Sequence, residues 1–464
     1  MKGNTLKRSS KQSGKSEAWR ARDRKVLWHP FTQQKLWMDE DFPVITRGKG
    51  ATLVDADGRK YLDGVSSLWC NVHGHARGEL NAAMKKQLGR VAHATFLGLS
   101  NPPAIELAEQ LVGLAPKGLT RVFYSDNGST AVEVALKMAF QYWQQNGQPR
   151  RTKFIALDAA YHGDTVGAVS VGGIELFHGV YKPLLFRTIK APATYAYRCD
   201  KARTLEECGQ HCIEEIEGIL KTHAHEVAAM IVEPLIQGAG GMITQPPGFL
   251  TGLRHLCDKY GVLLIADEVM TGFGRTGRMF ACEHEGVTPD LMAVSKGITG
   301  GYLPLAATLA TERIYKGFLG DFKDRRTFFH GHTYTGNALA CAAALASLEI
   351  FRKERLLDRV RKKIHRFGNL LQDLYMVEQV GDIRVCGLIA GIELVADPET
   401  KTPYPFELRM GHRAALEARK RGALLRPLGD TLVLMPPLSI SEAELAKLVE
   451  ITVESIKSAC ASPS

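Results

Sequence analysis

The chain has 464 residues and lacks any long apolar run. None of its hydrophobic stretches approaches the roughly 18–20 residues that a helix needs to cross a bilayer. The polar N-terminus also lacks the apolar stretch of a secretory signal. We therefore expect no membrane partner and no secretory signal.

Cysteine residues are few, and their spacing indicates no disulfide framework. The nine cysteines are scattered along the chain, which suits a reducing compartment and predicts a cytoplasmic protein. The closest pair, Cys208 and Cys212, flanks His211 at helical spacing, but no second pair with metal-ligand spacing accompanies it. We interpret the pair as one reduced face of a helix and expect no metal.

Acidic residues are in the minority, since 49 Asp and Glu stand against 59 Lys and Arg and leave a formal net charge of +10. Part of this excess lies in residues 1–24. Elsewhere the positive charge is spread out, without the basic block interleaved with aromatic residues that nucleic-acid binding favours. We expect a disordered basic tail over residues 1–24 and no nucleic-acid partner.

Apolar, strand-like runs alternate with longer helical patterns through the middle of the chain. Strands are predicted at residues 121–124, 153–157, 228–233 and 262–267, and helices at residues 129–145 and 248–260. The last strand is almost wholly apolar, as expected of a parallel strand covered on both faces. This alternation predicts an α/β domain with a mostly parallel sheet.

The pattern changes at both ends of this region. Near the start, two short strands flank the turn Asp57-Gly58 and predict a hairpin. From about Asn337 an Ala-rich helix is followed by strands near residues 383–394 and 431–435 and then by more helix. We predict a tail (1–24), an N-terminal segment that joins the small domain (25–74), a large domain (75–337) and a smaller α+β domain (338–464).

The turn Asp126–Thr130 lies between a predicted strand and a predicted helix. Gly128 permits close approach of the backbone, and Ser129 and Thr130 supply hydroxyls that can cap the helix. Free backbone N–H groups and the positive helix end then face one spot, which suits phosphate. The alternative is that the hydroxyls only cap the helix.

A carboxylate and an amine follow two of the apolar runs. Asp267 stands at the end of a predicted buried strand, at the sheet edge where open α/β sheets bind ligands. There it can hold a metal, act as a base or pair with a protonated ring nitrogen. Lys296 follows the apolar run 291–294, where apolar neighbours can lower the pKa of its amine and make it competent for a Schiff base. Their pairing favours such a site over an ordinary surface lysine.

The segment Gly272–Gly277 matches the pattern G-x-G-x-x-G and follows a predicted strand. The residues after it do not open a helix, and no clear βαβ unit with a ribose-binding acid follows. We interpret this segment as a glycine-rich active-site loop and not as a dinucleotide site.

At this point the chain resembles a known family. The segment Leu263–Gly277 together with Lys296 resembles the signature of class III, or ω-type, aminotransferases, which belong to the fold type I superfamily dependent on pyridoxal 5'-phosphate. Further segments resemble the biotin-pathway branch of this family, which acts on 8-amino-7-oxononanoate: residues 28–33, 66–74, 161–164, 328–337, 426–430 and 434–437. The resemblance runs from about residue 28 to residue 457.

The resemblance implies how the cofactor is held. Lys296 is expected to form a Schiff base with the cofactor aldehyde and to shuttle a proton, and Asp267 to pair with the pyridine N–H. Tyr161 is expected to stack against the ring. Two backbone N–H groups, of Gly128 and Ser129, are expected to hold the phosphate.

The resemblance also implies that each site is shared between subunits. Thr333 and the peptide of His332 are expected to reach the phosphate from the neighbouring subunit. Gly331 is expected to border the substrate channel. An obligate homodimer follows.

For the substrate, the resemblance makes Arg426 the expected clamp for a carboxylate, because a guanidinium binds one bidentately. The alternative is a structural ion pair. Arg275 is a secondary candidate. Where members that use S-adenosylmethionine carry a tyrosine and a second tryptophan at the substrate wall, this chain has Phe31 and Leu68.

The implied activity is ping-pong amination of 8-amino-7-oxononanoate to 7,8-diaminononanoate. We predict S-adenosylmethionine as the amino donor, although residues 328–334 also resemble members that use lysine. Two alternatives remain: another ω-aminotransferase acting on diamines or β-amino acids, and a non-catalytic protein that binds phosphate or nucleic acid.

Overall fold

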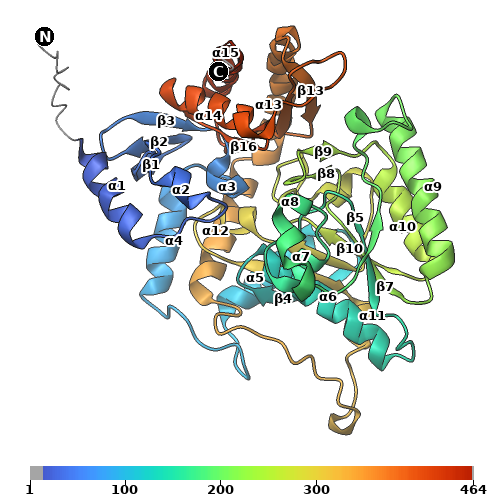
Figure 1. Cartoon of the computed structure of the whole chain (residues 1–464). Coiled ribbons are helices and arrows are strands. Elements are labelled where there is room, and N and C mark those ends of the chain that lie inside the picture. Colours follow the sequence, from blue (N-terminus) through green and yellow to red (C-terminus); the bar gives the residue numbers. More distant parts are fainter. Residues whose placement is uncertain (1–13, 462–464) are drawn as a thin grey trace, which may run out of the picture.

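The computed structural model describes residues 14–461, and a seven-stranded sheet lies at its centre (Figure 1). Only β12 runs antiparallel to its neighbours in this sheet, so the prediction of a mostly parallel α/β sheet is confirmed. The strands follow one another in the order β4 (Leu119–Ser125), β12 (Ala306–Thr311), β11 (Leu291–Val294), β10 (Leu263–Asp267), β7 (Val227–Val232), β5 (Lys153–Leu157) and β6 (Ile189–Ala191).

Helices cover both faces of this sheet because its central strands are apolar on both sides. On β10, Leu263 and Ile265 pack in the cluster that contains α6 (Gly128–Gln145). Leu264 and Ala266 belong to the opposite cluster. That cluster also contains residues of α5 (Pro102–Leu114), α9 (Leu205–His223), α10 (Phe249–Tyr260) and α12 (Ala338–Lys353).

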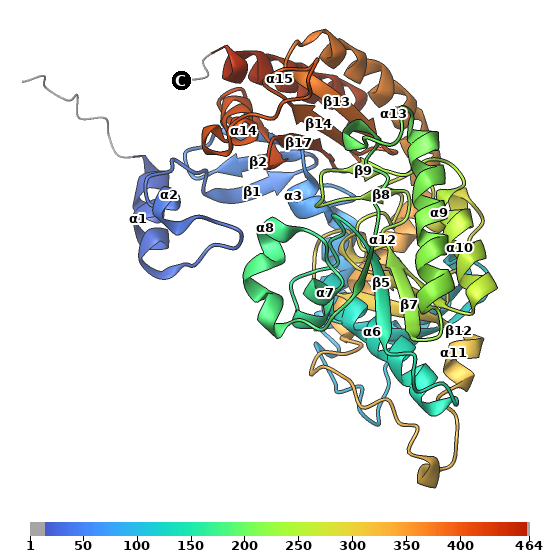
Figure 2. The ribbon, with the colours of Figure 1, turned by 45° about the vertical axis from the view of Figure 1, so that its right-hand side comes forward.

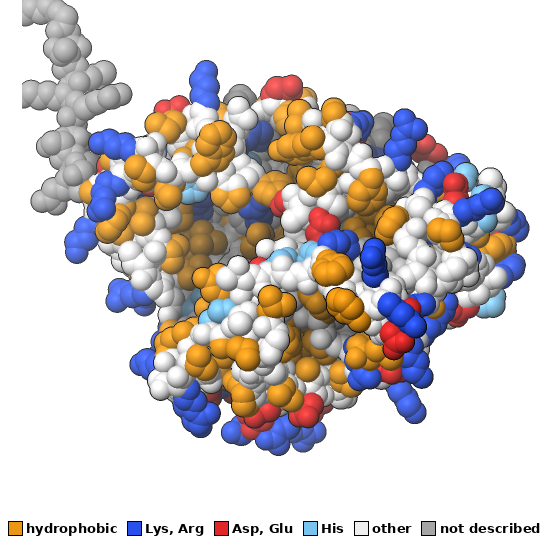
Figure 3. Space-filling model, turned by 90° about the horizontal axis from the view of Figure 1, so that it is seen from below, with side chains coloured by type: hydrophobic (Ala, Val, Ile, Leu, Met, Phe, Trp, Pro, Cys, Tyr) orange, Lys and Arg blue, Asp and Glu red, His pale blue; other side chains and the backbone are white. Residues whose placement is uncertain are grey.

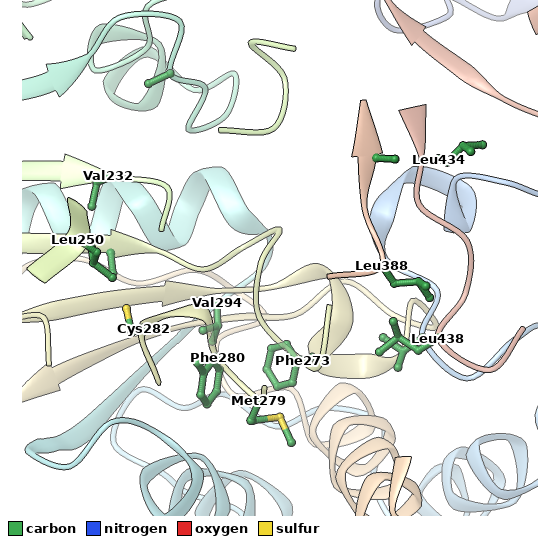
Figure 4. Packing of buried hydrophobic residues seen from close by; sticks show 14 of the residues in the cluster. Val232, Leu250, Phe273, Met279, Phe280, Cys282, Val294, Leu388, Leu434 and Leu438 are labelled. Atoms are coloured by element: carbon green, nitrogen blue, oxygen red, sulfur yellow. The ribbon is translucent and has the colours of Figure 1, made fainter. Parts of the chain in front are cut away.

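The larger cluster continues beyond the sheet. Phe273 and Phe280 pack edge to face at 5.5 Å, and Figure 4 shows the same cluster reaching Leu388 and Leu438. The segment Gly272–Gly277 is therefore buried in the core. The prediction that it forms an active-site loop is wrong, because its phenylalanine is drawn into the apolar interior.

A second, antiparallel sheet lies in the C-terminal part of the chain, beside α13 (Leu356–Leu370), α14 (Met410–Lys420) and α15 (Glu442–Cys460). Its strands follow the order β13 (Val380–Val385), β14 (Ala390–Leu394), β17 (Thr431–Leu434) and β16 (Arg426–Leu428). This arrangement of strands and helices fits the predicted smaller α+β unit.

The N-terminal segment joins this C-terminal part through a third sheet. This sheet has four strands. The N-terminal segment supplies β1 (Ile45–Lys49), β2 (Thr52–Asp55) and β3 (Lys60–Asp63), and β15 (Ala423–Leu424) pairs in parallel with β3. The pairing supports the predicted joining of residues 25–74 to the small domain. The domain boundaries themselves stay a proposal.

The predicted disorder of the basic tail is wrong for residues 15–24, which lie in α1 (Lys15–Val26). Arg20 is buried, and its Nε donates to the carbonyl of Phe42 at 2.7 Å. The guanidinium of Arg24 lies over the ring of Phe42. Contacts with later residues thus order a helix that its polar sequence alone does not predict. Residues 1–13 lie outside the described residues.

The remaining short elements connect these layers. They are α2 (Gln34–Trp37), α3 (Ser66–Trp69), α4 (Gly78–Leu88), α7 (Val166–Ser170), α8 (Glu175–His178), α11 (Glu312–Lys316), β8 (Ile236–Gln237) and β9 (Ile243–Thr244). No helix within residues 14–461 combines the length and the apolar character of a membrane span.

Candidate active site

A cavity of about 690 Å³ opens at the carboxyl ends of the central strands. Its wall is formed by the turn before α6, the loop after β5, the ends of β10 and β11, and α3. Six of the residues singled out from the sequence line it together: Leu68, Gly128, Ser129, Tyr161, Asp267 and Lys296. This is the sheet edge where open α/β sheets bind ligands.

The turn at the start of α6 is built to leave backbone donors free. Asn127 is the N-cap, and its side chain accepts from the N–H of Thr130 at 3.1 Å, while the hydroxyl of Thr130 accepts from the N–H of Asn127 at 3.0 Å. The expected capping role is therefore confirmed for the hydroxyl of Thr130 and wrong for Ser129, because Asn127 is the N-cap residue. The N–H groups of Gly128 and Ser129 belong to the first helical turn, where no intrahelical acceptor exists.

Two glycines let neighbouring loops close around this turn. Gly163 has φ +123°, and a Cβ there would lie 2.0 Å from Oγ of Ser129. A Cβ on Gly128 would lie 2.6 Å from Cγ1 of Val269. Such contacts are too short for any side chain, so the loops form a tight cradle beside a positive helix end, which fits a phosphate group.

Asp267 is buried at the end of β10 and is held on both oxygens. Its Oδ2 lies 2.7 Å from Nδ1 of His162, and its Oδ1 accepts from the N–H of Val269 at 3.0 Å. The Nε2 atom of His162 is buried without a hydrogen-bond partner among the described residues. This histidine had no role in the sequence analysis, because its partner lies 105 residues away.

A second carboxylate, Glu233, lines the same cavity and was also missed from the sequence. It accepts from the backbone N–H groups of Tyr161 at 3.0 Å and Gly238 at 2.8 Å. Burial raises the pKa of Glu233 to about 7. The position of Glu233 at the end of the apolar run 227–232 was the only sequence signal.

Lys296 is an unpaired amine in this cavity. It begins the 3-10 helix Lys296–Thr299 with φ +43°, a left-handed conformation that costs about 1–3 kcal/mol and recurs at functional sites. Its Nζ lies 5.1 Å from the ring centre of Trp69 and makes no hydrogen bond or ion pair with a described residue. Burial lowers the pKa of Lys296, and the charge of Asp267 opposes this shift. A lysine of this kind is suited to attack an aldehyde.

Tyr161 lines the cavity, whereas Arg426 lies outside the lining and is linked to it through an electrostatic interaction with Tyr161. The hydroxyl of Tyr161 donates to Asp164 Oδ2 at 2.7 Å, and burial raises the pKa of Tyr161. Arg426 begins β16, and its guanidinium has no hydrogen bond or ion pair with any described side chain. Burial lowers the pKa of Arg426, and the phenol of Tyr161 opposes that shift. A half-buried, unpaired guanidinium is a receptor for an anion.

Arg275 does not share this arrangement. It is fully buried, its Nη1 donates to the carbonyl of Pro436 at 2.6 Å, and its Nη2 donates to Oγ of Ser66 at 3.3 Å. The prediction that it is a secondary substrate contact is wrong, because its buried guanidinium joins the start of α3 to the segment after β17.

The predicted residues Gly331, His332 and Thr333 do not line the cavity of their own chain. They lie in the segment between the 3-10 helix Phe322–Asp324 and α12, and only the earlier part of this segment extends away from the body in Figures 1 and 2. His332 Nδ1 lies 3.0 Å from Asp126 Oδ2, and His93 Nε2 lies 2.8 Å from the carbonyl of Thr333.

The family model for class III aminotransferases matches residues 36–456. The chain belongs to the class III aminotransferase family. It is an enzyme that transfers amino groups and uses pyridoxal 5'-phosphate as its cofactor. The unpaired amine of Lys296, the buried Asp267 and the cradle at Gly128 fit this cofactor.

Individual relatives cover nearly the whole chain. An adenosylmethionine-8-amino-7-oxononanoate aminotransferase from Nitratidesulfovibrio vulgaris is 59% identical over 93% of this chain and 80% of its own. The crystal structure of the enzyme of that name from Methanocaldococcus jannaschii has a TM-score of 0.91 at 46% identity, covering 96% of this chain and 99% of its own. An amine transaminase from an uncultivated Pseudomonas species, solved in its PLP-bound form, has a TM-score of 0.89 at 39% identity, covering 94% and 98%.

Proposed function

We propose that this aminotransferase converts 8-amino-7-oxononanoate to 7,8-diaminononanoate in biotin biosynthesis, with S-adenosylmethionine as the amino donor. The observation that carries the proposal is the 59% identity, over 93% of the chain, to an aminotransferase named for this donor and this acceptor. The unpaired guanidinium of Arg426 supports it, because both molecules carry a carboxylate. Donor and acceptor bind to the same cavity one after the other.

Lys296 and Asp267 are the residues that we assign to the chemistry. Pyridoxal 5'-phosphate supplies an aldehyde and a ring that accepts electrons. Lys296 is held as a reactive amine by its apolar surroundings and moves the proton of the amino-bearing carbon. Asp267, oriented by His162, keeps a proton on the ring nitrogen.

We assign phosphate binding to the backbone N–H groups of Gly128 and Ser129. Thr333 and the peptide of His332 complete this site from a second copy of the chain, and Gly331 of that copy borders the substrate channel. The assignment is consistent with the absence of these three residues from the lining of the cavity in their own chain. The ring of Tyr161, fixed through its backbone by Glu233, packs against the cofactor ring.

Phe31 and Leu68 complete the proposed substrate wall. Leu68 lines the cavity within α3, where Ser67 has φ +62° and Trp69 has φ +64°. Strain on both sides of one residue at a cavity wall is typical of a shaped binding site. Both side chains are apolar, so they contact carbon atoms of the substrates and leave the charge to Arg426.

A homodimer is part of the proposal. Phe322 is 100% exposed and Phe329 is 83% exposed in the extended segment before α12. Hydrophobic side chains are also spread over the face of the molecule in Figure 3. Large aromatic side chains exposed on a projecting segment are suited to contact a second subunit. We also place the enzyme in the cytoplasm, because all nine cysteines are free thiols.

The direct test is product formation. Purified, cofactor-loaded enzyme is incubated with S-adenosylmethionine and 8-amino-7-oxononanoate, and 7,8-diaminononanoate is measured by mass spectrometry. Matched reactions replace the donor with lysine, or both substrates with ornithine or 4-aminobutyrate and a 2-oxo acid. Formation of 7,8-diaminononanoate with lysine but not with S-adenosylmethionine would overturn the assignment of the donor. Turnover of ornithine or 4-aminobutyrate without 7,8-diaminononanoate would overturn the acceptor and favour another ω-aminotransferase.

A further inference from the structure

A row of three aromatic side chains runs from the surface to the cavity. Phe31 meets Phe177 edge to face, with ring centres 5.2 Å apart and ring planes at 74°. Phe177 meets Tyr161 in the same way, at 6.4 Å and 88°. Tyr161 lines the cavity. The row therefore connects the N-terminal segment with the catalytic centre through α8.

The loop that carries Phe31 is built to display this side chain. Phe31 has φ +49°, which is costly for an aromatic residue, and its side chain is still 55% exposed. Nε2 of Gln34 bridges the loop by donating to the carbonyls of His29 at 3.0 Å and Thr32 at 3.1 Å. The surrounding hydrogen bonds thus hold a residue with a strained backbone in place. Backbone strain that is held in this way occurs often at functional sites.

The unit behind this loop is also firmly anchored. The carboxylate of Asp23 accepts from Nε1 of Trp37 at 3.0 Å and lies 2.9 Å from Nε2 of His29. The ring of Trp37 stacks on Phe42 with centres 3.9 Å apart. Figure 2 shows the unit with α1 and α2 lying beside α8. Phe31 is therefore fixed opposite Phe177.

The side chains of the short helix α8 differ in their exposure to solvent. Leu176 is 71% exposed, whereas Phe177 is half-buried. His178 is buried and stacks on Tyr161 at 6.3 Å. Phe177 thus lies between the surface and the catalytic residues, with an aromatic neighbour on each side.

We propose that Phe177 and Phe31 form an apolar gate at the outer end of the substrate channel, and that Phe177 determines specificity by packing on the methylene chain of the acceptor. This inference rests on the proposed function. Two phenylalanine rings offer no hydrogen bond, so they favour a hydrocarbon segment over a polar one. Arg426 supplies the charge for the carboxylate, and the gate supplies the surface for the chain between the two functional ends.

The test compares Phe177→Ala and Phe31→Ala with Leu176→Ala, a matched change on the outward side of α8. With wild-type turnover of 8-amino-7-oxononanoate established, each gate variant is expected to raise KM for this acceptor about 5- to 10-fold, the range of one aromatic contact. The kcat value and the absorbance of the bound cofactor should stay as in wild type. Leu176→Ala should leave KM unchanged. Unchanged KM in both gate variants would overturn the proposal.

A binding measurement separates the gate from the assigned reaction. Titration calorimetry of nonanoate, an aliphatic monocarboxylate, into cofactor-loaded enzyme should give a Kd raised by a similar factor in Phe177→Ala and in Phe31→Ala. Phe31 is exposed, so its variant should fold even where Phe177→Ala does not. Equal Kd values for wild type and Phe31→Ala would contradict the gate. A wild-type enzyme that fails to aminate the acceptor would instead contradict the proposed function.

Discussion

Two cations near the cavity differ in what surrounds them. Lys296 lies against the face of Trp69 and interacts with the charge of Asp267, whereas Arg426 forms no ion pair with a described side chain and has the phenol of Tyr161 nearby. Burial lowers the pKa of both groups, but a guanidinium stays charged at any physiological pH. The same environment therefore makes a nucleophile of the lysine and an anion receptor of the arginine.

Arg426→Ala should raise KM for 8-amino-7-oxononanoate by about 100-fold, since removing one partner of a desolvated charge pair costs about 2–5 kcal/mol. Arg426→Lys keeps the charge without the bidentate geometry, so its KM for the acceptor should lie between those of wild type and Arg426→Ala. The measurement is steady-state kinetics at saturating donor. An unchanged KM for 8-amino-7-oxononanoate in Arg426→Ala would contradict the assignment of Arg426 as the residue that binds the carboxylate.

The amine of Lys296 gives a prediction for pH. Only the neutral amine attacks the cofactor aldehyde, and burial lowers its pKa from the ordinary value of 10.5. Recombination of apoenzyme with pyridoxal 5'-phosphate should therefore speed up as pH rises and reach half its maximal rate below pH 10.5. The absorbance of the bound cofactor follows the reaction.

Asp267→Asn is the control for that profile. The carboxylate of Asp267 raises the pKa of Lys296, so its removal should move the midpoint to still lower pH. A midpoint at or above 10.5 in wild type, or a shift upward in Asp267→Asn, would contradict the electrostatic account.

Sequence reasoning reached the residues that end apolar strands and missed those that depend on distant partners. Lys296 and Asp267 each follow a buried run, so their place at the sheet edge was predictable. His162 and Glu233 act through contacts with residues 105 and 72 positions away. Glu233 also follows an apolar run, but nothing local in the sequence marks its contact with Tyr161 or the contact of His162 with Asp267.

Among the elements, the start of α6 combines stability with binding. Asn127 forms a capping box with Thr130, and Ser441 forms one with Glu444 at the start of α15. Only the first of these lies at the cavity. The two caps therefore offer a matched pair.

Asn127→Ala and Ser441→Ala should each lower the free energy of unfolding by about 1 kcal/mol, the usual effect of losing an N-cap. Only Asn127→Ala should also weaken the binding of pyridoxal 5'-phosphate, because it loosens the turn that presents Gly128 and Ser129. Thermal unfolding of the apoenzyme and cofactor titration measure the two effects. Equal cofactor affinity in both variants would contradict the role of the turn.

The elements themselves were predictable to the extent that local pattern sets them. The predicted helix 248–260 is found as Phe249–Tyr260, and the strand 153–157 as Lys153–Leu157. The helix Lys15–Val26 was missed because its order depends on the ring of Phe42. Tertiary contacts override weak local signals there.

At the scale of the whole molecule, a complete cofactor site needs residues from two copies of the chain. The enzyme should sediment at twice its chain mass of 51.0 kDa. Thr333→Ala should raise the Kd of pyridoxal 5'-phosphate about 10- to 100-fold, the effect of losing one hydrogen bond to a charged group. Thr222→Ala, at an exposed threonine on α9, is the control. A stable monomer with full cofactor affinity would refute the shared site.

The central claim is that one cavity accepts an amino group from S-adenosylmethionine and passes it to 8-amino-7-oxononanoate. The most direct measurement follows the absorbance of cofactor-loaded enzyme while the two substrates are added one after the other, with Lys296→Ala as the inactive control. We predict that S-adenosylmethionine bleaches the cofactor band, that 8-amino-7-oxononanoate restores it, and that one equivalent of 7,8-diaminononanoate appears. A band that neither molecule changes, under conditions where another amine bleaches it, would contradict the account.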